Sequence, residues 1–346
     1  MLYNNLGSTN ISVSKICLGT MTFGQQNTQA EAHQQLNYAL SQGVNFIDTA
    51  EMYSVPGTKE TQGSTERFIG SWLAKNTTER NNIILASKVT GPSDVFSYIA
   101  PSMKFTKARI TNAIEQNLKR LQTNYLDIYQ LHWPERKTNY FGVLGYNNHD
   151  AAWEDNFEET LNALDQIKKA GKILHWGLSN ETPWGVMRTC AISNNKGYSL
   201  PQSIQNPYNL LNRTFEIGLA EMAIRENIGL LAYSPLGFGL LTGKFNKGTD
   251  TPNDRINKFT RLARYNGQLS KNATTQYLTL AEASGLTLTN MALAFVTGRP
   301  FVTSNIIGAT TIAQLKENIN SINTILSADV LLEIEKIHTA IPNPAP

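Results

Sequence analysis

The sequence predicts an α/β protein: a single (β/α)8 TIM barrel with an N-terminal β-hairpin and an extra C-terminal helix. Short apolar segments rich in β-branched residues alternate regularly with segments of helical periodicity, and eight such units can be counted. The apolar segments read as strands buried on both faces, which is typical of a parallel sheet covered by helices. A chain of 346 residues fits one barrel, so we expect residues 1–346 to form one domain.

The first four units follow a hairpin expected over residues 2–14. A helix over residues 29–43 ends at Gly43, and another over 156–172 is stopped by Gly171, as expected of C-terminal glycines. In the helix over residues 106–122, Ile110, Ile114 and Leu118 share one face. The strands are expected at 15–21, 45–50, 82–89 and 125–133, and the helices at 29–43, 64–76, 106–122 and 156–172.

The last four units continue the alternation to the C-terminus. An irregular stretch after the seventh strand is followed by two helical segments, and a final helix over residues 327–341 begins at the N-cap Ser327. The strands are expected at 173–180, 202–209, 229–237 and 304–311, and the helices at 182–195, 215–227, 273–285, 289–298 and 312–326.

Composition excludes several classes of function. The 30 Lys and Arg against 27 Asp and Glu give a formal charge of +3, with no basic stripe of the kind that binds nucleic acid. Two cysteines without paired spacing, Cys17 and Cys190, indicate a reducing compartment. No signal peptide or membrane-length apolar segment is present, so we expect a cytoplasmic protein that does not bind membranes. The oligomeric state stays open.

Four polar residues follow three neighbouring strands of the predicted barrel. Asp48 ends the second strand and Tyr53 follows it, Lys88 ends the third, and His132 ends the fourth. Each has an ordinary structural explanation alone, as a turn, surface or core residue. Active sites of such barrels lie at the carboxyl ends of the strands, however, so these side chains are expected to converge on one mouth.

Together the four residues suit the reduction of a carbonyl group. A phenol titrates near pH 10 and is a poor acid unless its anion is stabilised. A nearby ammonium is expected to lower the pKa of Tyr53, and an ionised carboxylate keeps that ammonium charged and oriented. A neutral imidazole adds a hydrogen bond to the substrate oxygen. The set predicts a general acid aimed at a carbonyl that becomes an alkoxide.

At these residues the sequence resembles the aldo-keto reductase family. The resemblance is carried by "NFIDTAEMY" with Asp48 and Tyr53, "ASKV" with Lys88 and "LHWP" with His132, and it runs from Lys15 to Asn318. The segments "CLGTMTFG" and "YSPLGFGLLTGK" look closest to the bacterial Tas-like branch, which is related to potassium-channel β subunits. The resemblance implies NADPH-dependent reduction of an aldehyde or ketone, with Tyr53 as proton donor, Lys88 and Asp48 tuning it, and His132 orienting the carbonyl.

The resemblance also implies a nicotinamide cofactor lying extended across the barrel mouth. Ser179 and Asn180 can bond a carboxamide, and Tyr233 offers an aromatic face for the ring. "SPLGFGLLTGK" fits neither a Walker loop nor the dinucleotide fingerprint, but it follows the seventh strand, a common phosphate-binding position. By resemblance, the nicotinamide contacts are Gly19, Thr20, Met21, Asp48, Ser179, Asn180, Gln205 and Tyr233, and the pyrophosphate contacts are Ser234, Leu236, Gly239 and Lys244.

The adenosine end is expected at "IIGATTIAQLKEN", where helix-start amides and hydroxyls favour an anion. By resemblance its contacts are Gly308, Thr310, Gln314, Glu317 and Asn318. Better-known family members carry Lys and Arg where this chain has Gly308 and Gln314. We therefore expect Lys244 and an arginine of residues 255–264, Arg261 or Arg264, to supply the charge for the 2′-phosphate of NADPH.

Two long irregular stretches, residues 91–105 and 134–156, are expected to overhang the substrate pocket because both follow strands that carry catalytic candidates. Trp133 is expected to form a wall of the pocket. The aromatic residues of the second stretch, which suit a flat or apolar carbonyl substrate, are Tyr140, Phe141, Tyr146 and Trp153.

Two other functions compete with a carbonyl reductase. A regulatory protein resembling channel β subunits would bind the cofactor and sense redox state with slow turnover. A metal-dependent hydrolase would need a cluster of ligands, and the five histidines show no His-x-His pair, so we expect no metal site.

Overall fold

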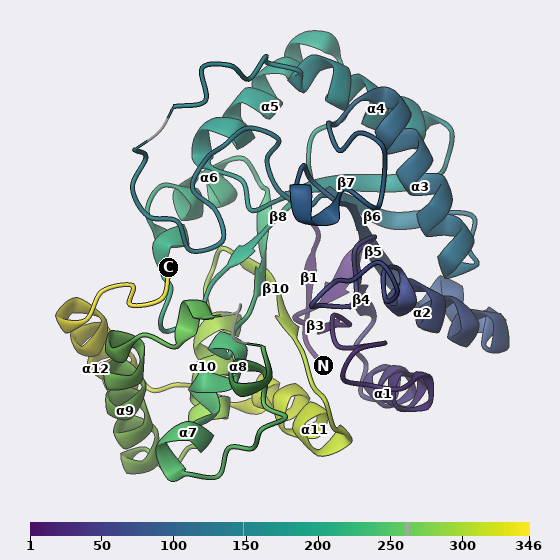
Figure 1. Cartoon of the computed structure of the whole chain (residues 1–346). Helices are drawn as coiled ribbons and strands as arrows, with labels where there is room; N and C mark the ends of the chain where they lie inside the picture. The colour runs from purple at the N-terminus through teal and green to yellow at the C-terminus, as the bar shows by residue number, and fades with distance from the viewer. Residues whose placement is uncertain (148, 260–262) are drawn as a thin grey trace.

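A closed barrel of eight parallel strands forms the centre of the molecule (Figure 1). The computed structural model describes residues 1–147, 149–259 and 263–346. The order around the barrel is β10-β3-β4-β5-β6-β7-β8-β9, which confirms the predicted barrel. The strands are β3 (Ile16–Gly19), β4 (Phe46–Asp48), β5 (Ile84–Val89), β6 (Leu126–Leu131), β7 (Ile173–Ser179), β8 (Ser203–Pro207), β9 (Gly229–Tyr233) and β10 (Val302–Ile307).

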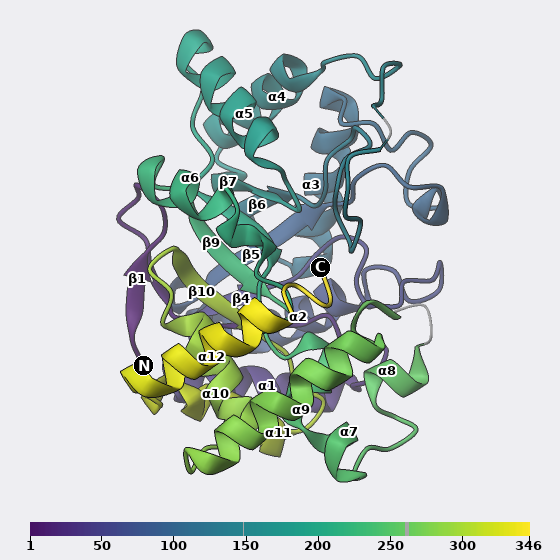
Figure 2. The ribbon, with the colours of Figure 1, turned by 90° about the vertical axis from the view of Figure 1, so that its left-hand side faces the viewer.

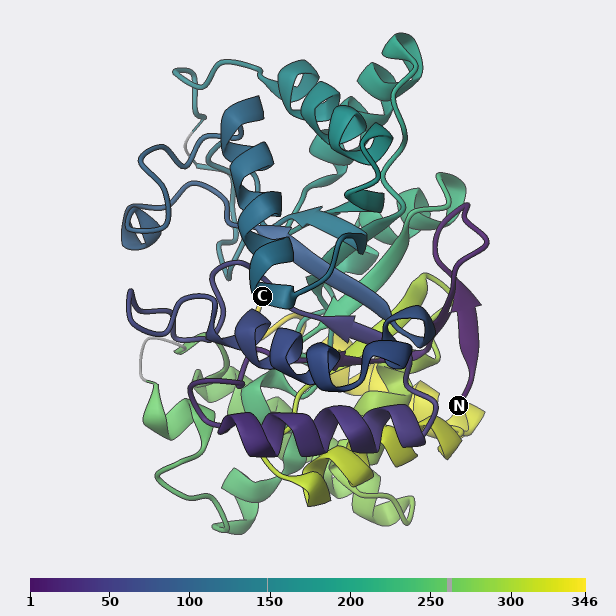
Figure 3. The same cartoon turned by 90° about the vertical axis from the view of Figure 1, so that its right-hand side faces the viewer.

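Helices surround the barrel and cover the outer face of its strands (Figures 1 and 3). Those between β3 and β9 are α1 (Gln29–Ser41), α2 (Ser64–Lys75), α3 (Lys107–Leu121), α4 (Phe157–Lys169), α5 (Pro183–Lys196) and α6 (Leu219–Arg225). Two short helices, α7 (Lys244–Lys247) and α8 (Arg255–Lys258), occupy the irregular stretch after β9. The remaining helices are α9 (Gln268–Ala283), α10 (Leu288–Thr297), α11 (Ile312–Asn320) and the predicted extra helix α12 (Ala328–Ala340).

The predicted N-terminal hairpin closes the amino end of the barrel. Its strands β1 (Tyr3–Asn5) and β2 (Ser12–Ser14) pair antiparallel. Leu6 and Val13 are completely buried in one cluster with the inward-facing residues Cys17, Phe46, Ala86, Ile128, Leu231 and Ile306. Because this end of the barrel is sealed by apolar side chains, polar chemistry is confined to the carboxyl end.

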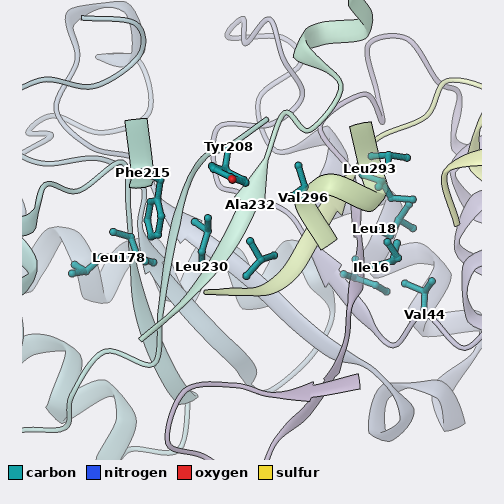
Figure 4. Packing of buried hydrophobic residues seen from close by; sticks show 14 of the residues in the cluster. Ile16, Leu18, Val44, Leu178, Tyr208, Phe215, Leu230, Ala232, Leu293 and Val296 are labelled. Atoms are coloured by element: carbon teal, nitrogen blue, oxygen red, sulfur yellow. The ribbon is translucent and has the colours of Figure 1, made fainter. Parts of the chain in front are cut away.

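The main hydrophobic core lies between the strands and the helices (Figure 4). It runs around the barrel without a break, from Ile16, Leu18 and Val44 to Leu178 and Phe215. Burying one such side chain contributes about 1.5–3 kcal/mol. This layer fixes the strands, so that residues at their carboxyl ends are held on a rigid ring.

Most helix ends follow the expected capping. Gly43, with φ of +81°, follows α1, and the Ser327 hydroxyl accepts a hydrogen bond from the Val330 amide at 3.3 Å at the start of α12. The segment expected as one helix over 215–227 is instead a 3-10 turn followed by the short α6. Gly218 separates them, because its φ of +87° cannot belong to a helix.

The C-terminal segment returns from α12 to the carboxyl end of the barrel. Helices α9 and α12 pack side by side (Figure 2). Beyond α12 the Ala345 amide donates a hydrogen bond at 3.0 Å to the carbonyl of Leu211, which lies after β8. Pro346 thereby reaches the cleft described below.

Candidate active site

The register of the barrel places the candidate residues on neighbouring strand ends. Gly19 of β3 pairs with Asp48 of β4, and Lys88 of β5 pairs with Gln130 of β6. Ser179 of β7 pairs with Gln205 of β8. Residues far apart in the sequence therefore lie on adjacent strands around one mouth.

A buried ion pair joins β4 to β5 beneath this mouth. Lys88 Nζ donates to Asp48 Oδ2 at 2.6 Å and to the carbonyl of Thr49 at 2.8 Å. Lys88 has no exposed surface and Asp48 is 2% exposed. The second carboxylate oxygen, Oδ1, accepts from Gln205 Nε2 at 2.8 Å and from Gln130 Nε2 at 3.3 Å. Both charges are thus compensated, as a buried ion pair requires.

Tyr53 lies directly against this ion pair. Its ring centroid is 5.1 Å from Lys88 Nζ, and the side chain lines the cleft while being 8% exposed. No described residue forms a hydrogen bond with its hydroxyl, which leaves that group available to a ligand.

The pKa of Tyr53 is set mainly by burial, and not by the Lys88 ammonium as the sequence suggested. Burial raises the pKa of Tyr53 well above its ordinary value, and the charge of Asp48 raises it further. Asp48 lies 2.6 Å from the ammonium and offsets part of its charge, so the attraction of Lys88 for a phenolate does not outweigh the effect of burial. Tyr53 is therefore held in its protonated form, ready to give a proton only to a strong base.

The rings of His132 and Tyr53 pack edge to face. The ring centroids are 5.8 Å apart with the planes at 73°. Burial lowers the pKa of His132 well below 6.5, and the positive charge of Lys88 lowers it further, so the imidazole is neutral. Its Nδ1 is buried and has no hydrogen-bond partner among the described residues. A neutral ring can donate a hydrogen bond to a substrate oxygen.

These residues open into a cleft of about 1190 Å³ at the carboxyl end of the barrel. Asp48, Tyr53 and His132 line it, whereas Lys88 lies behind Asp48. Pockets for drug-sized ligands measure about 300–1,000 Å³, so this cleft has room for a large ligand beside a small one. The candidate cofactor contacts that also line the cleft are Gly19, Thr20, Met21, Ser179, Asn180, Gln205, Tyr233, Ser234, Leu236, Gly239, Lys244, Gly308, Thr310, Gln314, Glu317 and Asn318.

Hydrogen bonds fix the polar groups on the β7–β9 side of the cleft. The Tyr233 hydroxyl donates to Asn180 Oδ1 at 2.6 Å, and Asn180 Nδ2 donates to the carbonyl of His132 at 2.9 Å. The Ser179 hydroxyl donates to the carbonyl of Gln205 at 2.8 Å. The side chain of Asn180 is thus occupied in orienting Tyr233 and the His132 backbone, while the Tyr233 ring faces the cleft.

The segment after β9 carries the positive charges of the cleft. Lys244 forms an ion pair with Asp254, and Arg255 follows directly. Arg255 lines the cleft, and burial lowers its pKa to about 10 because no described carboxylate compensates the charge. Arg264 also lines the cleft, whereas Arg261 lies outside the described residues. The arginine beside Lys244 is thus Arg255, which sequence reasoning did not single out.

Helix α11 begins beside the cleft, at the segment where the sequence predicts an adenosine site. The Thr311 hydroxyl accepts from the Gln314 amide at 3.2 Å, and Thr310 donates through its amide to Gln314 Oε1 at 2.9 Å. Asn318 Nδ2 donates to the carbonyl of Gly308 at 3.0 Å. A Cβ added at Gly308 would meet nothing within 4 Å, so the approach to this backbone is open.

The two long loops form the other end of the cleft, but only part of the expected aromatic set faces it. Tyr140 and Phe141 line the cleft together with Trp133, whose Nε1 donates to the carbonyl of Pro92 at 2.9 Å. Tyr146 points outward against His149, and Trp153 packs against Phe157 and Trp184. Trp133 therefore joins both loops, and the apolar wall is smaller than the loop composition suggested.

Sequence reasoning missed two features that hold the site together. Gln130 of β6 is completely buried and donates to Asp48 of β4 across the barrel interior, past β5. The available signal was its position two residues before His132, which gives the two side chains the same inward direction on the strand. Arg109 of α3 forms a bidentate ion pair with Glu51, with bonds of 2.9 and 2.5 Å. Nothing in the local sequence links residues so far apart along the chain.

The described part of the chain offers neither a metal-binding cluster nor a membrane-spanning helix. In residues 1–147, 149–259 and 263–346 no group of three or more His, Cys, Asp or Glu is arranged to hold a metal ion. In the same ranges no helix has both the length and the apolar character to cross a membrane.

Comparison with known proteins places this geometry in context. Residues 15–339 match the model of the aldo/keto reductase family. The chain is 49% identical over 347 residues to Protein tas of Escherichia coli, covering 100% of both chains. It is 31% identical to the uncharacterized oxidoreductase YrpG of Bacillus subtilis, covering 97% of this chain and 96% of the relative. A probable voltage-gated potassium channel subunit beta of Arabidopsis thaliana is 28% identical and is covered to 98%.

Proposed function

The chain belongs to the aldo/keto reductase family of oxidoreductases, and from this premise we propose that it reduces an aldehyde or ketone to an alcohol with NADPH, using Tyr53 as the proton donor. The observation that carries the proposal is the buried Lys88–Asp48 pair against the ring of Tyr53, with the neutral His132 at its edge. Structural ion pairs are common, but here one lies under a phenol whose hydroxyl has no partner among the described residues.

The residues fit a nicotinamide dinucleotide along the cleft. The Tyr233 ring, oriented by Asn180, would face the nicotinamide, and Lys244 and Arg255 would meet the phosphates. The start of α11 would hold the adenosine end. Bound in this way, the cofactor supplies a hydride. Two cationic side chains on one wall, Lys244 and Arg255, support NADPH over NADH.

The residues of this chain would manage the proton. As the carbonyl oxygen gains negative charge, the Tyr53 hydroxyl donates its proton to it, because an alkoxide is a stronger base than a phenolate. The ring of the phenolate that remains lies 5.1 Å from the Lys88 ammonium. The positive charge of Lys88 then stabilises the phenolate. Neutral His132 donates a hydrogen bond to the same oxygen and fixes the carbonyl.

The regulatory alternative predicts a different result in one assay. Fluorescence titration with NADPH and NADH measures cofactor binding and preference, and multiple-turnover reduction of 4-nitrobenzaldehyde measures catalysis. We expect tighter binding of NADPH and sustained turnover. Binding of cofactor without turnover of any aldehyde would favour a redox-sensing regulatory protein instead.

A further inference from the structure

The charged side chains that line the cleft are unbalanced. Each of its carboxylates has a partner among the described residues: Asp48 with Lys88, Asp254 with Lys244, Glu282 with Lys247, and Glu317 with the Thr287 hydroxyl. Arg255 and Arg264, in contrast, form no ion pair with any described residue. The cleft therefore presents two guanidinium groups to ligands.

The two arginines lie at different places. Arg255 follows Asp254, the partner of Lys244, on the side assigned to the phosphates. Arg264 lies beside the loop of residues 134–156: its Nε is 3.2 Å from the position of a Cβ added to Gly142, and its guanidinium carbon is 5.9 Å from the centre of the Phe141 ring. The backbone oxygen of Pro346 is 3.3 Å from the same Cβ position. The guanidinium also lies close enough to Tyr233 and Tyr265 to oppose the rise that burial causes in the pKa of both phenols. One of its terminal nitrogens, Nη1, is buried without a hydrogen-bond partner in the described chain.

A continuous row of rings connects the proton donor to Arg264. The ring of Tyr53 lies 5.8 Å from that of His132, and His132 lies 4.9 Å from Trp133. Trp133 lies 5.6 Å from Phe141, over which Arg264 is placed. A ligand with its carbonyl at Tyr53 and a flat apolar body that extends along Trp133 and Phe141 would point toward the guanidinium.

We propose that Arg264 binds an anionic group of the substrate, so that the protein prefers aryl or similarly flat aldehydes and ketones that carry a carboxylate remote from the carbonyl. The inference rests on the proposed reductase function. Arg264 has no ion-pair partner among the described side chains and its buried Nη1 has no hydrogen-bond partner there, and a carboxylate satisfies the planar donors of a guanidinium in a bidentate manner. Burial of the Phe141 and Trp133 faces favours the apolar body of the same ligand.

The test compares 4-carboxybenzaldehyde with its neutral methyl ester, methyl 4-formylbenzoate, in the full-length protein with NADPH. The ratio of kcat/KM for acid over ester is measured for the native protein, Arg264→Gln and Arg264→Lys. Comparing this ratio between proteins cancels the different intrinsic reactivities of the two aldehydes. We expect Arg264→Gln to lower it about tenfold or more, as for loss of a charge-assisted hydrogen bond, and Arg264→Lys to lower it less.

Arg255→Gln is the matched control. It should weaken NADPH binding in the fluorescence titration and leave the acid-to-ester ratio unchanged. An unchanged ratio in Arg264→Gln would overturn the proposal. A loss of NADPH affinity in Arg264→Gln with the ratio preserved would also overturn it, because Arg264 would then bind the cofactor. An acid-to-ester ratio that changes in Arg255→Gln but not in Arg264→Gln would overturn it as well.

A binding measurement separates this proposal from the proposed function. Calorimetry compares 4-(hydroxymethyl)benzoate with its methyl ester, using the native protein and Arg264→Gln in the presence of NADPH. Tighter binding of the acid that disappears in Arg264→Gln supports the anion site, even if the protein turns over no aldehyde. In that case only the proposed reductase function fails. Turnover of aldehydes without any Arg264-dependent preference overturns the anion site alone.

Discussion

Removing Arg109 should destabilise the protein and impair catalysis by two separable effects. Glu51 lies between Asp48 and Tyr53, and its carboxylate accepts two bonds from Arg109, at 2.9 and 2.5 Å, and one from the Thr90 amide at 2.9 Å. Both side chains of the ion pair are at least 95% buried. In Arg109→Met the carboxylate keeps only the Thr90 amide and stays away from water.

The expected cost follows from this loss. Breaking a buried ion pair by removing one partner costs about 3–5 kcal/mol, a large part of a total stability of about 5–15 kcal/mol. Replacing both partners by apolar side chains of similar size is often neutral or stabilising. In this protein the Thr90 amide would then lose its acceptor, which costs about 1–3 kcal/mol. The double variant Glu51→Met/Arg109→Met should therefore recover most of the stability lost in Arg109→Met.

Catalysis should not recover in the double variant. The Glu51 carboxylate accepts from the Thr90 amide just beyond β5 and from Arg109 of α3, so its bonds hold the turn that carries Tyr53 against the strand that carries Lys88, and neither variant keeps all of them. We expect kcat to stay low in both variants while NADPH still binds, because the cofactor contacts lie elsewhere.

Urea unfolding midpoints and steady-state kinetics of the variants are the assay. Arg225→Met is the control, because Arg225 and Glu221 form an exposed pair at 73% and 71% side-chain exposure and should contribute under about 1 kcal/mol. Stability of Arg109→Met within about 1 kcal/mol of the native protein would refute the reasoning, as would a double variant no more stable than the single one.

Three further predictions concern the site itself. Lys88→Met should lower kcat at least about 100-fold, with NADPH bound normally, because the phenolate of Tyr53 loses its counter-charge; kinetics with an unchanged pH–rate profile would argue against this role. Since the folded-state pKa of His132 is depressed, the unfolded chain takes up a proton below pH 6.5 that the native protein does not, and stability should fall as the pH drops through this value. Urea midpoints at pH 5 and 7.5 should show that His132→Gln loses less stability on acidification than the native protein does. Gly91→Ala should displace the indole of Trp133, which lies 2.4 Å from the added Cβ, and change KM for aldehydes in steady-state kinetics, whereas Gly267→Ala, with its nearest atom at 3.9 Å, should not.

The barrel was predictable because its signals are local. Each strand is a short apolar run, most helices carry their own caps and periodic faces, and eight repeats leave few ways to bury both faces of a parallel sheet. Strand ends could then be read directly, and Asp48, Lys88 and His132 lie at or beside them. The main error in a helix, at residues 215–227, came from Gly218, whose positive φ outweighed the helical pattern around it.

The parts that could not be predicted depend on packing between distant residues. Whether Tyr53 is made more or less acidic depends on its burial and on how fully Asp48 neutralises Lys88, and neither is written in the local sequence. Likewise, nothing in the composition of the 134–156 loop separates Phe141, which faces the cleft, from Trp153, which packs on Trp184. Side-chain direction in a long loop is set by its neighbours.

The most direct test of the central mechanism is Tyr53→Phe, which removes one hydroxyl and keeps the ring beside Lys88. Measured with NADPH and 4-nitrobenzaldehyde, its kcat should fall by at least about 100-fold, the scale of general acid catalysis, while the fluorescence titration gives an NADPH affinity within about twofold of the native value. Turnover near the native rate in this variant would mean that another group delivers the proton.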